Sequence, residues 1–262
     1  MAADMTRPTE DIAGYSICTL PPARCVSDMT EWIERGAAPG FFACANPHSL
    51  VVAEQRPEFK AALSAADWLT PDGQGILLAS RMAGGAIRER VTGADVFEGL
   101  SRALSERGGY RVFFLGSSER TLEAMTSRFA REFPKLEIAG SHSPPFAEEF
   151  TQAQMDGMVE RVNQAKTDVL WVGMTAPKQE LWIHENLPRL EVKFIGAIGA
   201  VFDFFAGTKE RPALFYQKLG LEWLVRVMRE PRRLGHRVLV SVPQFARIAA
   251  RHAIASRFRK QT

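Results

Sequence analysis

The chain has 262 residues, of which 46% are hydrophobic and 24% charged, a composition typical of a soluble globular protein long enough to bury a core. It contains no run of 18 apolar residues that could cross a bilayer, and its first eleven residues carry three acids and no apolar centre, unlike a secretory signal. We therefore expect a cytoplasmic protein. A reducing compartment also suits its three cysteines, which lack CxxC spacing: Cys18, Cys25 and Cys44.

Charge is divided unevenly along the chain. Residues 207–262 contain thirteen Lys and Arg against three Glu, a net charge of +10, whereas residues 1–206 contain twenty against twenty-seven acids, a net charge of −7. We therefore expect a body at 1–206 and a basic appendage at 207–262. A basic end on an acidic body indicates an anionic partner, either nucleic acid or phospholipid head groups.

Short apolar runs alternate with amphipathic segments along the body. After a loose start at 1–14, strands are predicted at 40–45, 66–70, 110–116, 136–139 and 168–173. Helices are predicted at 25–36, 48–63, 75–82, 95–107, 121–133, 150–166 and 181–186. This order predicts an α/β fold, in which a mostly parallel, Rossmann-like sheet has helices on both faces.

Polar residues follow two of the predicted strands directly. Asn46 comes after the first strand, and Asp72 comes after the second, between a proline and a glycine. Because the carboxyl ends of parallel strands meet at one edge of a sheet, we expect both side chains at one crevice. Arg90, in the loop that follows the next helix, can bring a cation to the same place. Local sequence leaves open that Asp72 is instead a helix cap or turn residue.

Two later turns are candidates for phosphate binding. The strand at 110–116 runs through a single glycine into a helix start, where free N–H groups favour an anion. The dinucleotide fingerprint needs three glycines, and no Walker A motif occurs, so a nicotinamide-dependent oxidoreductase and an NTPase are disfavoured. At the start of the helix near 181, Lys178 can meet phosphate and Gln179 a base edge or sugar hydroxyl. The alternative there is a solvated first turn that contains Lys178 and Glu180.

Six short motifs occur in order between residues 41 and 237. They are Asn46-Pro47, Pro71-Asp72-Gly73, Glu89-Arg90-Val91-Thr92-Gly93, Ala176-Pro177-Lys178-Gln179-Glu180, the run GAIGAVFD at 196–203, and a segment from Leu219-Gly220 to Arg232-Arg233. Together they resemble the ordered motifs of the WecG/TagA/CpsF glycosyltransferases, glycosyltransferase family 26. The resemblance implies an inverting, metal-independent transfer of a hexose from a UDP-sugar to a polyprenyl-diphosphate-linked sugar in cell-surface polysaccharide synthesis. It implies that no cofactor is needed and that the transferred hexose is N-acetylmannosamine, its uronic acid or glucose.

The resemblance also implies roles for individual residues. Asp72 matches the proposed catalytic base, Arg90 an arginine that steadies the diphosphate, and Gln179 a glutamine of the donor pocket. The other positions assigned to the donor are Cys44, Asn46, Thr92, Lys178 and Asp203. Cys44 stands where the family usually has threonine, and because a thiol donates hydrogen bonds poorly, the substrate can differ. The absence of an Asp-x-Asp motif agrees with a reaction that uses no metal ion.

The appendage combines apolar and basic residues at helical spacing. Such a segment can lie on an anionic membrane with its aromatic and aliphatic side chains inserted and its arginines at the head groups. We assign five arginines to the membrane or to the lipid diphosphate: Arg226, Arg229, Arg232, Arg233 and Arg237. The alternative is a helix packed on the body or on a second subunit, and an apolar tail also favours a homo-oligomer.

A second class of function fits the basic tail. A non-catalytic module that binds a nucleotide or nucleic acid would show strongly salt-sensitive binding. The apolar residues interleaved in the tail favour lipid over a phosphate backbone alone. We therefore expect a peripheral enzyme on the inner face of the cell membrane, with a UDP-sugar and a lipid-linked sugar as partners and no nucleic acid.

Overall fold

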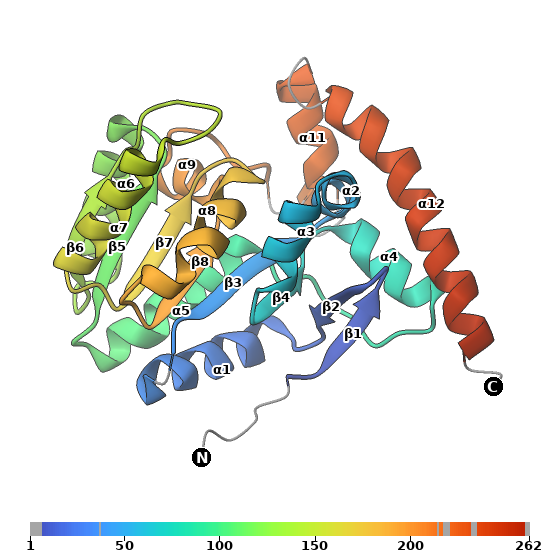
Figure 1. Cartoon of the computed structure of the whole chain (residues 1–262), viewed down its shortest axis with the longest axis horizontal. Coiled ribbons are helices and arrows are strands. Elements are labelled where there is room, and N and C mark those ends of the chain that lie inside the picture. Colours follow the sequence, from blue (N-terminus) through green and yellow to red (C-terminus); the bar gives the residue numbers. More distant parts are fainter. Residues whose placement is uncertain (1–6, 37, 214, 217–220, 232–234, 260–262) are drawn as a thin grey trace.

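A computed structural model describes residues 7–36, 38–213, 215–216, 221–231 and 235–259. Six strands form one sheet in the order β4-β3-β8-β7-β5-β6, and every neighbouring pair is parallel. They are β3 (Gly40–Ala45), β4 (Trp68–Pro71), β5 (Arg111–Gly116), β6 (Glu137–His142), β7 (Val169–Gly173) and β8 (Phe194–Ala197). The predicted α/β fold with a parallel sheet is confirmed (Figure 1).

Helices cover both faces of the sheet (Figure 1). Those with side chains in the core of one face are α2 (Pro47–Gln55), α3 (Pro57–Ser64), α4 (Gln74–Met82), α7 (Gln152–Gln164), α8 (Lys178–Asn186) and α12 (His236–Arg259). Those of the other face are α1 (Pro22–Arg35), α5 (Gly93–Arg107), α6 (Glu119–Glu132) and α9 (Val201–Ala206). The short η1 (Leu187–Arg189) follows α8, and α11 (Glu222–Arg229) precedes α12. Strands buried on both faces explain the continuous apolar runs of the sequence.

Two neighbouring inner strands of the sheet, β3 and β8, are followed by helices on opposite faces. β3 continues into α2 on one face, whereas β8 continues into α9 on the other. In an open α/β sheet, ligands bind beyond the carboxyl ends of the strands, at the point where neighbouring connections diverge. The fold therefore places the candidate site beyond Ala45 and Ala197, which end β3 and β8.

The loose start that we expected at 1–14 is wrong from Thr9 onward, and residues 1–6 lie outside the described residues. From Thr9 the chain forms an antiparallel hairpin of β1 (Thr9–Ile12) and β2 (Tyr15–Cys18). Ala13 and Gly14 make its two-residue turn with positive φ angles of 55° and 86°, the geometry that follows the natural twist of the two strands. Ile12, Tyr15 and Ile17 of the hairpin are buried in the core of the α2 face.

Proline sets one helix boundary that the sequence pattern missed. The helix predicted at 48–63 is divided into α2 and α3, because the ring of Pro57 disfavours a helical backbone at the preceding residue. Arg56 accordingly has φ −130° and ψ 95°. The helix predicted at 181–186 begins earlier, at Lys178, and β8 lies where no strand was predicted from the residue pattern.

Helix α12 packs directly on the body. Phe245 and Ala249 are buried in the core of the α2 face, and Ser241 Oγ lies 2.8 Å from Nδ1 of His48 in the first turn of α2. The α12 helix thus reaches the end of α2 that follows Asn46. The division of the chain after residue 206 stays a prediction. Within the described residues, no helix is long and apolar enough to span a bilayer.

Candidate active site

Asp72 follows β4 at the crevice. Its backbone N–H donates to the Ala45 carbonyl at 2.8 Å, so the ends of β3 and β4 are joined beside Asn46. The N-cap of α4 is Gly73, with φ 94°, a region that favours glycine, and no side chain caps the helix there. The half-buried Asp72 side chain therefore does not occupy the N-cap position.

Arg90 is held next to the same strand end. The Val91 N–H donates to the Pro71 carbonyl at 2.9 Å, and the Thr70 hydroxyl donates to the Val91 carbonyl at 2.8 Å. Because Asp72 follows Pro71 and Arg90 precedes Val91, these bonds bring the two residues to one edge of the sheet. The structure thus brings together the predicted base and the predicted diphosphate-binding arginine.

Asn46 and Thr92 have structural duties as helix caps. Asn46 Oδ1 accepts from the Ser49 N–H at 2.9 Å, and Thr92 Oγ1 accepts from the Asp95 N–H at 3.3 Å; both belong to reciprocal capping boxes. Thr92 Oγ1 also donates to Asp95 Oδ2 at 2.7 Å. These bonds place both residues at helix starts that border the crevice, and their contact with a donor stays a prediction.

Cys44 is the last residue but one of β3, and its Sγ lies 3.7 Å from Thr70 Oγ1 in β4. Burial raises the pKa of its thiol well above the usual range, and the charge of Asp72 adds to the effect, followed by smaller contributions from Glu180 and Asp95. The thiol is therefore protonated at neutral pH. The negative charges of three carboxyl groups thus act on this thiol.

Gln179 and Glu180 form a buried pair between the ends of β7 and β8. Gln179 Oε1 accepts from the Gly199 N–H at 3.0 Å and from the Met174 N–H at 3.3 Å, and its Nε2 donates to Glu180 Oε1 at 2.9 Å. Burial raises the pKa of Glu180 to about 7, against the lowering effect of the Gln179 bond. Glu180 is only 4% exposed, so the solvated first turn considered for it is wrong.

Lys178 turns toward the loop that follows β6. Its Nζ donates to the Ala147 carbonyl and lies 4.7 Å from the centre of the Phe150 ring. Ser143 of the same loop donates to the Ser117 carbonyl at 2.7 Å, so this loop is tied to the exits of both β5 and β7. Lys178 thus stands at the rim of the crevice, and its phosphate contact stays a prediction.

Asp203 lies on the other side of the crevice, in α9. Its Oδ2 is 2.8 Å from Lys209 Nζ, and its Oδ1 accepts from the hydroxyls of Thr121 and Thr208, each at 3.5 Å. Thr121 belongs to the first turn of α6, which Ser118 caps through a 3.2 Å bond. Asp203 therefore links α9 to the start of α6, which we considered as a phosphate-binding site. Its contact with a nucleotide stays a prediction.

The five arginines assigned to lipid are described only in part. Arg229 Nη1 donates to the Glu210 carbonyl at 2.9 Å, and its Nη2 lies 3.7 Å from Glu210 Oε2. Arg232 and Arg233 lie outside the described residues, as do the side chains of Arg226 and Arg237. Their assignment stays a prediction.

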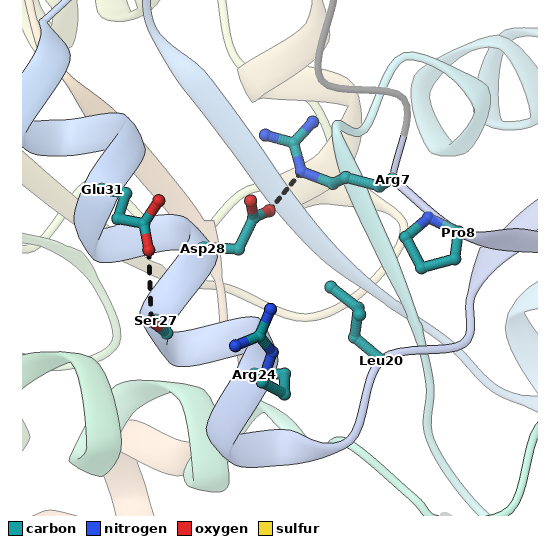
Figure 2. A pocket seen from close by; sticks show the side chains of 7 residues that line it. All are labelled: Arg7, Pro8, Leu20, Arg24, Ser27, Asp28 and Glu31. Atoms are coloured by element: carbon teal, nitrogen blue, oxygen red, sulfur yellow. Dashed lines mark hydrogen bonds and ion pairs between the residues drawn. The ribbon is translucent and has the colours of Figure 1, made fainter.

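A pocket of about 250 Å³ lies between α1 and the residues on either side of the β1–β2 hairpin (Figure 2). Figure 2 shows Arg7 and Asp28 joined across it, with Nε 2.6 Å from Oδ2. Asp28 Oδ2 also accepts from Trp68 Nε1 at 2.8 Å, and the Arg7 guanidinium lies 3.7 Å from the centre of that ring. Trp68 begins β4, whereas Asp72 follows its end. This pocket is therefore separate from the crevice.

Comparison with known proteins identifies the family. The sequence model described as "Glycosyl transferase WecG/TagA/CpsF family" matches residues 10–259. A relative from Bacillus spizizenii (strain ATCC 23059 / NRRL B-14472 / W23) is 29% identical over 216 residues, covering 82% of this chain and 80% of its own. Relatives from Staphylococcus aureus strains MW2 and MRSA252 are 27% and 28% identical over 207 residues, covering 78% of this chain and 77% of theirs. All three are named N-acetylglucosaminyldiphosphoundecaprenol N-acetyl-beta-D-mannosaminyltransferase. With a family match over nearly its whole length and a parallel sheet that carries the motif residues at one crevice, this chain belongs to the WecG/TagA/CpsF family and is a glycosyltransferase.

Proposed function

We propose that this glycosyltransferase moves a sugar from a UDP-sugar to a polyprenyl-diphosphate-linked sugar, inverting the anomeric carbon without a metal ion. The observation that carries the proposal is the half-buried Asp72, which the backbone bonds of Ala45 and Val91 hold at one edge with Asn46 and Arg90. The names of the relatives make N-acetylmannosamine the first donor sugar to test and undecaprenyl-diphosphate-linked N-acetylglucosamine the first acceptor. The uronic acid of N-acetylmannosamine and glucose come next.

The reaction needs a base and a group that offsets the charge of the leaving diphosphate. Asp72 takes the proton of the acceptor hydroxyl while the hydroxyl oxygen attacks the anomeric carbon. The new glycosidic bond forms as the bond from the anomeric carbon to the diphosphate oxygen breaks, and its electron pair leaves with UDP. Arg90 and the nearby N-terminus of α5 offset the negative charge that develops on the diphosphate.

Replacing Asp72 by asparagine tests the base directly. We expect Asp72→Asn to lower the rate of transfer at least about 100-fold, since general base catalysis typically contributes 10²- to 10⁴-fold. Asp156→Asn is a matched control, because Asp156 is an exposed residue of α7, paired with Arg189. Turnover should be measured on both variants after circular dichroism has shown that they are folded. Near-normal turnover by folded Asp72→Asn would remove Asp72 from the mechanism.

The C-terminal helices are the proposed membrane contact. Met228 of α11 and Leu239 of α12 are 74% and 77% exposed, and Trp223, Leu224 and Val242 are also exposed. Leu239 and Val242 bracket Ser241, whose hydroxyl bonds to His48 at the start of α2. This apolar surface therefore lies near the mouth of the crevice, where a lipid-linked acceptor must enter. Its basic residues would sit at the head groups of the inner face of the cell membrane.

A further inference from the structure

The side-chain amide of Gln179 links the residues that follow β7 to those that follow β8. Its Oε1 accepts from Met174 N–H, one residue beyond β7, and from Gly199 N–H, two residues beyond β8. Gly199 has φ 49°, and a Cβ built on it would lie 3.6 Å from both terminal atoms of the Gln179 amide. The turn at 198–200 thus lies directly beside this amide. Since β8 adjoins β3, the same turn borders the edge that carries Asn46 and Asp72.

Only one orientation of this amide satisfies its neighbours. With Oε1 toward the two backbone N–H groups, both bonds form; turned by 180°, the NH₂ group would face two donors and lose both. The correct orientation leaves Nε2 in need of an acceptor, and Glu180 Oε1 fills that need at 2.9 Å. Glu180 therefore completes the hydrogen bonding of Gln179 in this orientation. Gln179 supports the turn after β8 together with the Val172 carbonyl, which accepts from the Ile198 N–H at 3.0 Å.

Glu180 is suited to this task as a neutral acid. Both side chains are almost fully buried, with Gln179 5% and Glu180 4% exposed. Glu180 Oε2 is buried and has no hydrogen-bond partner among the residues that the structure describes. An ionised carboxylate would leave a bare negative charge there, which is far more costly than one unpaired hydroxyl. Burial accordingly raises the pKa of Glu180 to about 7.

The charged groups on the elements that pack against α8 lie at the surface. Helix α8 packs mainly on α3, β8, η1 and α7. β8 has no ionisable side chain, and those of the other three elements are all exposed: Glu58, Lys60, Asp156, Glu160, Arg161 and Arg189. None of these elements therefore supplies a buried cation that would offset a negative charge on Glu180.

We propose that Glu180 is a positioning residue of the transfer reaction, which as a neutral acid orients Gln179 and so fixes the turn at 198–200 beside the site of transfer. This inference rests on the proposed function, since it assigns a role within that reaction. Ionisation of Glu180 would place an uncompensated charge at the buried Oε2 and so disturb the packing around Gln179, and full activity is therefore expected only with the protonated form. Above about pH 7 the wild-type kcat/KM should then fall tenfold per pH unit as Glu180 ionises.

The test compares Glu180→Gln, Glu180→Leu and the control Glu185→Gln, which alters an exposed glutamate on the same helix. The glutamine variant keeps an acceptor for Gln179 and cannot ionise, so its kcat/KM should stay within about threefold of wild type at pH 6 and lose the alkaline fall. The leucine variant leaves Gln179 Nε2 unpaired and should lose at least about tenfold in kcat/KM. Glu185→Gln should keep the wild-type profile.

Two results would overturn the inference: an alkaline fall in Glu180→Gln identical to that of wild type, or wild-type activity in Glu180→Leu. Should the leucine variant fail to fold, the pH profile of the glutamine variant decides. The wild-type enzyme is assayed first with UDP-N-acetylmannosamine and the lipid-linked acceptor. If it transfers nothing, the proposed function has failed on its own, and the pH dependence of urea unfolding of wild type and Glu180→Gln still tests the neutral state of Glu180.

Discussion

Three carboxyl groups raise the pKa of the Cys44 thiol by their charge, and each has a different environment. Asp95 Oδ2 accepts from the N–H and hydroxyl of Thr92, Glu180 accepts from Gln179, and Asp72 stands at the strand exit beside Arg90. A site with several acids can use one of them as a base when the others are neutral or hydrogen-bonded in place. Asp95 and Glu180 are thus each held by hydrogen bonds to a neighbouring side chain, and Asp72 is the carboxylate that we propose as the base.

The buried Glu180 should make the folded enzyme less stable at alkaline pH. Its pKa is raised from 4.5 to about 7, so between these values the folded state holds a proton that the unfolded state has lost. Stability therefore falls as pH rises through this range, by about 3 kcal/mol at 1.36 kcal/mol per pH unit. Glu180→Gln should lack this loss.

Urea unfolding at pH 5 and pH 8 measures the effect. Because other groups titrate as well, the quantity to compare is the difference in unfolding free energy between Glu180→Gln and wild type at each pH. We expect that difference to shift in favour of the variant by about 3 kcal/mol between the two pH values. An unchanged difference would show that Glu180 is ionised in the folded protein.

At the scale of elements, the site depends on close contact between α2, α4 and α12. A Cβ built at Gly75 in the first turn of α4 would lie 2.4 Å from Pro47 Cγ and 3.3 Å from Phe245 Cε1. Pro47 begins α2, and Phe245 belongs to α12. The glycine thus allows three helices to meet at the start of α4, the helix that follows Asp72.

Gly75→Ala should disturb this junction. Overpacking of a tight contact typically costs 1–3 kcal/mol, and a shift of α4 would also move Asp72, so activity should fall together with stability. Gly157→Ala in α7 is the matched control, because nothing lies within 4 Å of its Cβ position and alanine favours a helix by up to about 1 kcal/mol. Thermal unfolding and turnover of both variants give the comparison; equal stability of the two would mean that the junction can open without cost.

The sequence predicts those elements whose pattern is long or strongly apolar. Five of the six strands of the sheet follow from runs such as Val169–Gly173, which is buried on both faces. β1 and β2 have four residues each, and their turn places Ala13 at a positive φ, where asparagine or aspartate is the usual signal. The Ala-Gly pair between two alternating runs was the one indication available.

Local sequence predicts the site only in part. A polar residue after a strand is a sound indication of the crevice, and Asp72, Asn46 and Arg90 do meet at one edge. The burial of Glu180 depends on the packing of α8 on other elements, among them α3, which is remote in the chain, and no local pattern reports it. The amphipathic pattern of α12 also fitted a helix packed on the body, and the burial of Phe245 confirms that contact.

In the whole molecule, a basic end of the chain follows an acidic body, and α12, which belongs to the basic end, packs on that body. One side of α12 is buried against α2 and α4, and another exposes Leu239 and Val242. Removal of residues 207–262 would therefore uncover part of the core as well as remove the proposed membrane contact. Single substitutions separate these two effects.

Leu239→Glu and Met228→Glu should weaken binding to anionic liposomes. Each places a negative charge in the proposed membrane surface, where it is repelled by the head groups and opposes insertion. Ile254→Glu is the matched control, because Ile254 is also exposed, at 58%, but lies near the other end of α12. Sedimentation with phosphatidylglycerol vesicles should show less bound protein for the first two variants only. Equal binding by all three variants would show that Leu239 and Met228 do not contact the membrane.

UDP is the product of the proposed transfer reaction that is simplest to measure. Purified protein is incubated with a short-chain polyprenyl-diphosphate-linked N-acetylglucosamine and a panel of UDP-sugars, with and without EDTA. We expect UDP release that requires the acceptor, persists in EDTA, is greatest with one donor and disappears in folded Asp72→Asn. Release that stops in EDTA, or that Asp72→Asn retains, would contradict the proposed chemistry, and no release from any donor by folded wild-type protein would contradict the proposed substrates.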